Sequence, residues 1–125
     1  MHPYPQFRLI RLDAMAAVGS WVSLLAFIIG VGLSAFSIVE VEVSFVLFPF
    51  LAFFFFALLH FSASFLHRCP KCARHPTVQG FTSVHDSAKS DRGLEGWGRV
   101  VWDVFRNRPF RCIHCGEEYV ARNAA

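Results

Sequence analysis

Two long stretches without a charged side chain constrain this sequence more than any other feature. Residues 14–39 and 43–66 contain no Asp, Glu, Lys or Arg over 26 and 24 residues, respectively. A transmembrane helix needs about 20 predominantly apolar residues to cross roughly 30 Å of hydrocarbon. The whole chain is 54% hydrophobic and only 17% charged, and these two stretches account for most of the apolar excess. The sequence therefore predicts two membrane spans.

A cleaved signal peptide is the alternative explanation for the first stretch, because Arg8 and Arg11 precede it. The apolar part of a signal peptide is about 7 to 15 residues long and ends at a small-x-small cleavage site. The first stretch is longer than this, and no clear site of that kind ends it. We therefore expect it to be retained as a span.

The two predicted spans are too close together in sequence to run in any way but antiparallel. They form a transmembrane helical hairpin over residues 14–66, with a tight acidic turn near residues 40–42 that contains Glu40 and Glu42. Small side chains recur three or four residues apart along the first span, a spacing that lets helix backbones approach closely. The residues predicted to pack the helices together are Gly19, Ser23, Ala26, Gly30 and Ser34.

The second span is rich in phenylalanine, with nine between residues 45 and 65. These rings can fill the small-residue groove and leave others for lipid or another protein. His60 is the single Asp, Glu, Lys, Arg or His within either span, and intramembrane ionisable residues are functional candidates by default. However, His60 lies about six residues, roughly 9 Å, from the end of the span. The spans offer it no second histidine or carboxylate with which to build a site.

The distribution of basic residues predicts the orientation in the membrane. Residues 1–13 hold Arg8 and Arg11, the connection between the spans holds no Lys or Arg, and residues 67–125 hold ten. Short segments rich in Lys and Arg stay on the cytoplasmic side. We expect both termini to be cytoplasmic, with residues 1–13 as an N-terminal cytoplasmic segment.

All four cysteines fall in two C-x-x-C pairs, namely Cys69 with Cys72 and Cys112 with Cys115. Two such turns present four thiolates, which complete the tetrahedral shell that structural zinc prefers. The 39 residues between the pairs exceed the roughly 15 to 20 of compact sites, so we expect an insertion between two metal-binding turns. The sequence predicts a zinc site of these four cysteines within a small α+β module over residues 67–125.

Other chemistries of the cysteines are less consistent with the sequence. Disulfides are disfavoured in a reducing cytosol, and a thioredoxin-like redox pair would need a βαβ context for which this tail is too short. Iron in a rubredoxin-like shell uses the same four thiolates and stays open, although Ala73 stands where rubredoxins usually carry glycine. Four thiolates already satisfy zinc, so His67, His75 and His114 are expected to be neighbours of the metal and not ligands.

The residues around the two cysteine pairs resemble a known family. The segments "RCPKCARHP" and "FRNRPFRCIHCGEEYV" are similar to the knuckles of bacterial membrane-associated zinc-ribbon proteins. The likeness covers about 25 residues and none of the hairpin, and it implies a zinc-ribbon fold in a bacterial inner membrane. The matching positions are Cys69, Pro70, Cys72, Pro109, Phe110, Arg111, Cys112, Cys115, Gly116 and Tyr119.

The insertion between the cysteine pairs has two parts. Residues 76–93 are predicted to form a short strand followed by a polar loop, and residues 94–107 an amphipathic helix that Pro109 ends. The apolar face of this helix can lie on the membrane surface, or it can cover the scant core of the zinc module. In the first case the residues at the membrane interface are Trp97, Trp102, Arg106 and Arg108.

The expected function is non-enzymatic, because a site closed by four cysteines has no position for substrate or activated water. We expect an integral membrane protein that anchors a zinc-stabilised cytoplasmic module, as an interaction platform or an accessory subunit, with lipid and a membrane protein or a second copy as partners. The alternatives are a membrane-tethered rubredoxin-like electron carrier and a nucleic-acid-binding regulator. With ten basic and six acidic residues and −2 from zinc with four thiolates, residues 67–125 carry little positive charge, so nucleic acid is not expected.

Overall fold

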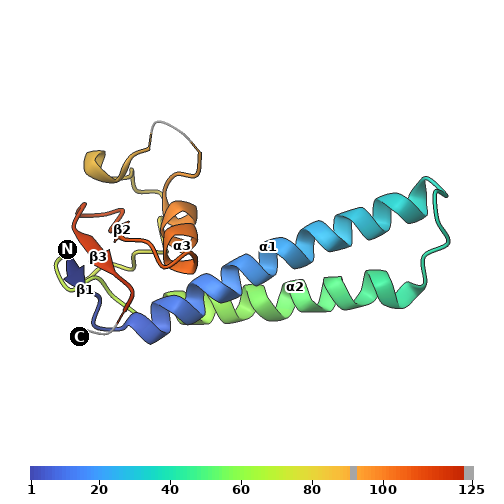
Figure 1. Ribbon diagram of the computed structural model, residues 1–125, viewed down its shortest axis with the longest axis horizontal. Helices are drawn as coiled ribbons and strands as arrows, with labels where there is room; N and C mark the ends of the chain where they lie inside the picture. The colour runs from blue at the N-terminus through green and yellow to red at the C-terminus, as the bar shows by residue number, and fades with distance from the viewer. Residues whose placement is uncertain (91–92, 123–125) are drawn as a thin grey trace.

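A computed structural model describes residues 1–90 and 93–122 of the chain. Two long helices, α1 (Phe7–Ala35) and α2 (Val43–Ser64), form an antiparallel pair. A small module packs where α1 begins and α2 ends, while their connection lies at the far end (Figure 1). Residues 91–92 of the predicted loop and 123–125 of the predicted module lie outside the described residues.

Both long helices are apolar and long enough to cross a membrane. The 22 residues of α2 span about 33 Å, whereas the 29 residues of α1 span about 43 Å at 1.5 Å per residue. A hydrocarbon layer of about 30 Å is therefore shorter than α1. The three charged residues of α1 all lie in its N-terminal turns: Arg8, Arg11 and Asp13.

The two helices approach closely where small residues of α1 meet bulky residues of α2. A Cβ added at Gly19 would lie 2.9 Å from the Phe56 ring, and one at Gly30 would lie 3.5 Å from Val46. Of the residues predicted to pack the helices together, Ser23 is buried, whereas Ala26 and Ser34 are exposed.

A three-stranded sheet in the order β1-β3-β2 forms one part of the module. Strands β2 (Phe110–Arg111) and β3 (Glu118–Val120) are antiparallel, as expected for a chain that reverses at the second cysteine pair. Strand β1 (His2–Pro3) pairs with β3 in parallel. The extreme N-terminus, which the sequence alone places in a separate segment, is thus an edge strand of the module, a position where proline is tolerated.

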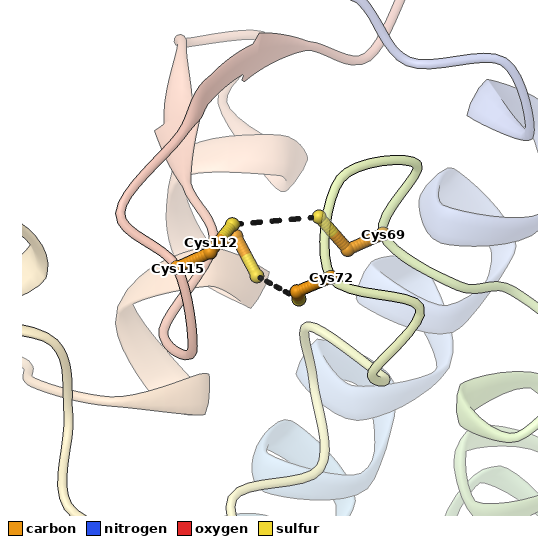
Figure 2. A group of neighbouring side chains, drawn as sticks. All are labelled: Cys69, Cys72, Cys112 and Cys115. Carbon is orange, nitrogen blue, oxygen red and sulfur yellow. Dashed lines mark hydrogen bonds between the residues drawn. The ribbon is translucent and has the colours of Figure 1, made fainter.

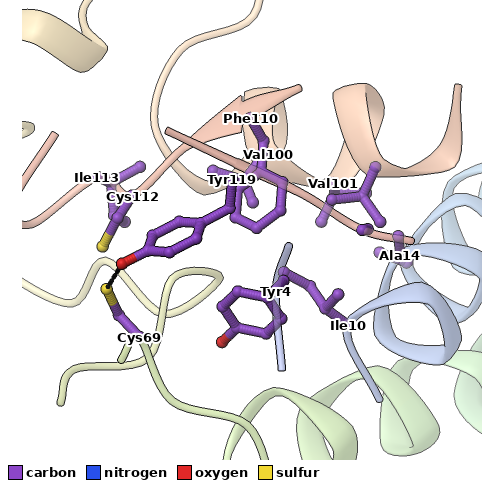
Figure 3. Close-up of a cluster of buried hydrophobic side chains, with 13 residues drawn as sticks. Tyr4, Ile10, Ala14, Cys69, Val100, Val101, Phe110, Cys112, Ile113 and Tyr119 are labelled. Carbon is purple, nitrogen blue, oxygen red and sulfur yellow. Dashed lines mark hydrogen bonds between the residues drawn. The ribbon is translucent and has the colours of Figure 1, made fainter. Parts of the chain in front are cut away.

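Helix α3 (Trp97–Phe105) forms the other part of the module and packs against α1. It follows the polar insertion, whose described residues contain a single 3-10 turn, η1 (Asp86–Ala88), and not the short strand that the sequence predicts. Three valines of its apolar face, Val100, Val101 and Val104, are buried in the core, whereas Phe105 remains 44% exposed. Figure 3 shows part of that core, whose largest side chains are Tyr4, Ile10, Val100, Val101, Val104, Phe110, Ile113 and Tyr119.

Candidate metal centre

The two cysteine pairs lie in turns with the same backbone hydrogen bonds. In the first turn, the amide of Cys69 donates to the carbonyl of Arg74 at 2.8 Å, and the carbonyl of Cys69 accepts from Ala73 at 2.9 Å. The second turn repeats both bonds at equivalent positions, at 2.9 Å from Cys112 to Glu117 and at 2.8 Å from Gly116 to Cys112.

The residue after the second cysteine of each turn has a left-handed backbone. Gly116 has a φ of 74° and Ala73 a φ of 58°, a region that costs residues with a Cβ about 1 to 2 kcal/mol. A Cβ at Gly116 would also lie 2.0 Å from Ser87 Oγ and 2.5 Å from His85 Nδ1. Glycine is therefore favoured in the second turn, whereas Ala73 strains the first.

The four sulfur atoms converge on one point between the turns (Figure 2). The Sγ atoms of Cys69 and Cys115 are 3.7 Å apart, those of Cys72 and Cys112 are 3.8 Å apart, and all four lie within 4.8 Å of one another. A tetrahedral metal with metal–sulfur bonds of about 2.3 Å has sulfur–sulfur edges of about 3.8 Å. The four cysteines therefore fit a tetrahedral metal ion, as the sequence predicts, and this spacing suits zinc and iron alike.

Hydrogen bonds to its sulfur favour release of the thiol proton of Cys69. Burial raises the pKa of the Cys69 thiol, but hydrogen bonds from the backbone of Cys72, the Tyr119 hydroxyl and the backbone of Lys71 outweigh it and lower the pKa to about 7. The Tyr119 oxygen lies 3.5 Å from the Cys69 sulfur. Without metal, Cys69 is therefore close to half ionised at neutral pH.

The two thiols of the second turn hold their protons more tightly than Cys69 does. Burial raises the pKa of Cys112 despite hydrogen bonds from the backbone of His114 and Cys115. Burial also raises the pKa of Cys115. Metal binding must displace these protons, since only thiolates are good ligands.

The three histidines beside the cysteines have roles other than metal binding. Within the described residues, the one group placed to hold a metal ion consists of the four cysteines. His75 Nδ1 donates to the carbonyl of His67 at 2.8 Å, and His114 Nε2 lies 3.0 Å from the carbonyl of Val78. These bonds tether residues 75–78 to both turns.

A buried polar cluster next to the metal centre is the main feature that the sequence analysis missed. Asp13 is fully buried and accepts hydrogen bonds from His60 Nδ1 at 2.5 Å, His67 Nε2 at 2.9 Å and Thr77 Oγ1 at 2.6 Å. The Tyr4 hydroxyl lies 3.2 Å from the other ring nitrogen of His67. The expectation that His60 has no carboxylate partner is wrong, because α1 begins at Phe7 and so includes Asp13.

The antiparallel register of the helices could have revealed this pair. Phe50 contacts Phe27, and Phe56 faces Gly19, so positions later in α2 face positions earlier in α1. Continuing this register places His60 opposite the first turns of α1, where Asp13 is the one carboxylate.

The residues predicted to lie at the membrane interface occupy different environments. Trp97 is partly buried between α1 and α2, with its ring 5.9 Å from that of Trp21 and stacked at 5.3 Å on His60. Trp102 is 36% exposed and stacks on Phe105 at 5.8 Å. Arg106 and Arg108 are exposed. Contact of these side chains with lipid stays a prediction.

Comparison of the chain with models of protein families, with curated proteins and with solved structures finds no match. The resemblance to zinc-ribbon proteins accordingly extends only to a four-cysteine group that is compatible with such a knuckle.

Proposed function

We propose that the chain is a non-enzymatic integral membrane protein. In this proposal α1 and α2 cross the bilayer, and the metal-binding module is held at the cytoplasmic surface as a docking platform or an accessory subunit of a membrane complex. The observation that carries the proposal is the exposed apolar surface of α2. The chain passes from this helix directly into the first metal-binding turn.

The exposure of α2 supports the membrane location. No residue in the most apolar 18-residue stretch of α2 is buried by the rest of the chain, whereas 28% of the corresponding stretch of α1 is buried. Soluble monomers rarely expose apolar patches larger than a few hundred Å². A bilayer, together with a partner protein or a second copy, would cover the large exposed rings Phe45, Phe48, Phe54, Phe55 and Phe61.

A structural zinc ion is the metal that best suits the site. Four cysteine ligands leave no open coordination position, and this closed arrangement is typical of zinc that stabilises a fold. The module's strands are only two or three residues long, so metal–ligand bonds would supply stability that so small a core lacks.

The contacts between hairpin and module favour a fixed platform over a freely moving domain. Only His67 and Arg68 separate Leu66 from the first metal ligand. The Arg68 amide donates to the side chain of Gln6 at 2.8 Å, and His67 is anchored on Asp13. A module held in one orientation suits recognition of a partner in the same membrane.

Purification of the full chain in a mild detergent tests these points together. We expect the protein to remain in the membrane pellet after alkaline carbonate washing, and to elute colourless with one zinc ion per chain and a co-purifying membrane protein. Release by carbonate would contradict the membrane location. A metal-free fold would contradict the structural zinc, and a lone monomer or homodimer the role as a subunit.

A membrane-tethered electron carrier with iron in the same site is the second candidate. It is favoured by the partial exposure of Cys72 and Cys115, which would bring one edge of the metal centre close to a redox partner. Ferric thiolate is coloured and zinc is not, so the visible spectrum of the purified protein separates the two. A colourless protein without a redox wave excludes the carrier.

A further inference from the structure

A groove lies between the first turns of α1 and the end of α3, outside the metal centre. Its volume is about 420 Å³. Leu12 and Met15 of α1 and Phe105 of α3 provide apolar walls, and Arg8 and Arg11 provide two guanidinium groups. The groove therefore combines apolar walls with two positive charges.

Within the described residues, the two arginines of this groove have no acidic partner. Arg11 donates to the side-chain oxygen of Asn107, and Arg8 lies over the Phe7 ring at 5.8 Å. By contrast, Arg111 in the sheet pairs with Glu118 at 2.9 Å. The groove is thus suited to an anionic ligand.

The segment after α3 places further basic residues near the groove, although they do not line it. The bond from Arg11 to Asn107 holds residues 106–108 beside the groove, and two of these three are arginines. The Arg106 guanidinium lies 5.8 Å from the Trp102 ring. Tryptophan beside basic residues is typical of the headgroup level of a membrane.

The apolar wall of the groove continues along α1. Met15, Val22 and Ile29 are seven residues apart and share one helix face, and each is more than half exposed. Arg8 and Arg11 lie in the first turns of α1. In a membrane these turns would lie outside the hydrocarbon, because α1 is longer than the hydrocarbon is thick. A ligand with an anionic head and an apolar tail could therefore place its head against the arginines and its tail along the apolar face of α1.

We propose that this groove binds one anionic phospholipid of the surrounding leaflet. Its phosphate would lie between Arg8 and Arg11, and one acyl chain would follow Leu12 and Met15 onto the exposed face of α1. This inference rests on the proposed insertion of α1 and α2 in a membrane. Because α1 and α3 form the two sides of the groove, the bound lipid would contact both and stabilise the packing of the module against the hairpin.

Lipid titration of the purified full chain tests the inference. Protein in neutral detergent is titrated with phosphatidylglycerol or phosphatidylcholine, and retained lipid is counted by native mass spectrometry. We expect one tightly held phosphatidylglycerol and a preference over phosphatidylcholine of about 25-fold, since two basic groups each contribute about fivefold. Equal binding of the two lipids would overturn the inference.

The double variant Arg8→Gln/Arg11→Gln should lose this preference without losing the fold. The matched control is Arg74→Gln/Lys89→Gln, which removes the same charge from exposed positions that do not line the groove. An unchanged preference in the groove variant, or an equal loss in the control, would refute the site. Carbonate extraction of the same samples tests insertion itself, so failure of the proposed membrane location is distinguishable from failure of the lipid site.

Discussion

His60 and Asp13 face each other across the α1–α2 pair, with His60 Nδ1 2.5 Å from Asp13 Oδ1. The second carboxylate oxygen of Asp13 accepts from His67 at the start of the first metal-binding turn and from Thr77 in the insertion. One buried carboxylate thus joins both helices to the module. A buried charge needs such partners, because its desolvation otherwise costs several kcal/mol.

Replacement of Asp13 should therefore weaken the contact between hairpin and module. Asp13→Ala removes the acceptor of three buried donors, and we expect a loss of about 3 to 5 kcal/mol. Thermal unfolding in detergent measures this loss. Asp86→Asn is the control, because the Asp86 side chain is 92% exposed and forms an exposed ion pair with Lys89. Equal effects of the two substitutions would contradict the role of Asp13.

Replacement of a cysteine should unfold the module and spare the helix pair. We expect Cys112→Ser to abolish metal binding and to make residues 67–125 sensitive to protease, because the small core depends on the metal. His114→Gln changes a residue beside the same turn and should keep the metal. Metal analysis and limited proteolysis of both variants decide the outcome. A protease-resistant tail in Cys112→Ser would show that the metal does not hold the module together.

Substitutions at the two left-handed positions of the metal-binding turns should have opposite effects on the stability of the module. Ala73→Gly relieves an unfavourable φ and should stabilise the module by up to about 1 kcal/mol. Gly116→Ala introduces a Cβ against His85 and Ser87 and should destabilise it by more than this. The chelator concentration that removes half of the metal reports both changes. Equal midpoints for the two variants would contradict the repeated turn geometry.

The close contact between Gly19 and Phe56 predicts a specific sensitivity within the helix pair. Gly19→Ala forces the Phe56 ring to move, and overpacking of this kind costs about 1 to 3 kcal/mol. Gly32→Ala is the matched control, because nothing lies within 4 Å of a Cβ at that position. We expect a lower melting temperature in detergent for the first variant only. A similar change in both would mean that the helices do not pack in this register.

Metal affinity should fall as the pH is lowered. Protons compete with metal for every thiolate, and burial keeps Cys112 and Cys115 protonated in the metal-free protein. Cys69 is also protonated, but only below its pKa of about 7. A plot of log affinity against pH, measured by competition with a chelator, should therefore become steeper by about one proton below pH 7. A constant slope from pH 6 to pH 8 would contradict the lowered pKa of Cys69.

Local patterns in the sequence predict much of the fold. The amphipathic helix is expected over residues 94–107 and found at Trp97–Phe105, because Gly96 adopts a positive φ of 68° and breaks the first predicted turn. The structure also places the apolar face of α3 against the module and α1, a choice that the hydrophobic pattern leaves open. That pattern records which face is apolar and not what covers it.

The sequence by itself determined the two long apolar helices and the four-cysteine group. Each depends on spacing within a short segment: about 20 uncharged residues for a helix that can span a membrane, and two intervening residues for a turn that presents two sulfurs. The meeting of the two turns is a tertiary contact, because the sulfurs that approach each other are 46 and 40 residues apart in sequence.

Only the tertiary structure decided how the helix pair and the module are joined. Tyr4 and His67 are 63 residues apart, and Asp13 and Thr77 are 64 residues apart. The parallel pairing of β1 with β3 likewise connects the two ends of the chain. Such contacts leave no periodic trace in the sequence, because each arises only when distant segments are packed and their polar groups are removed from water.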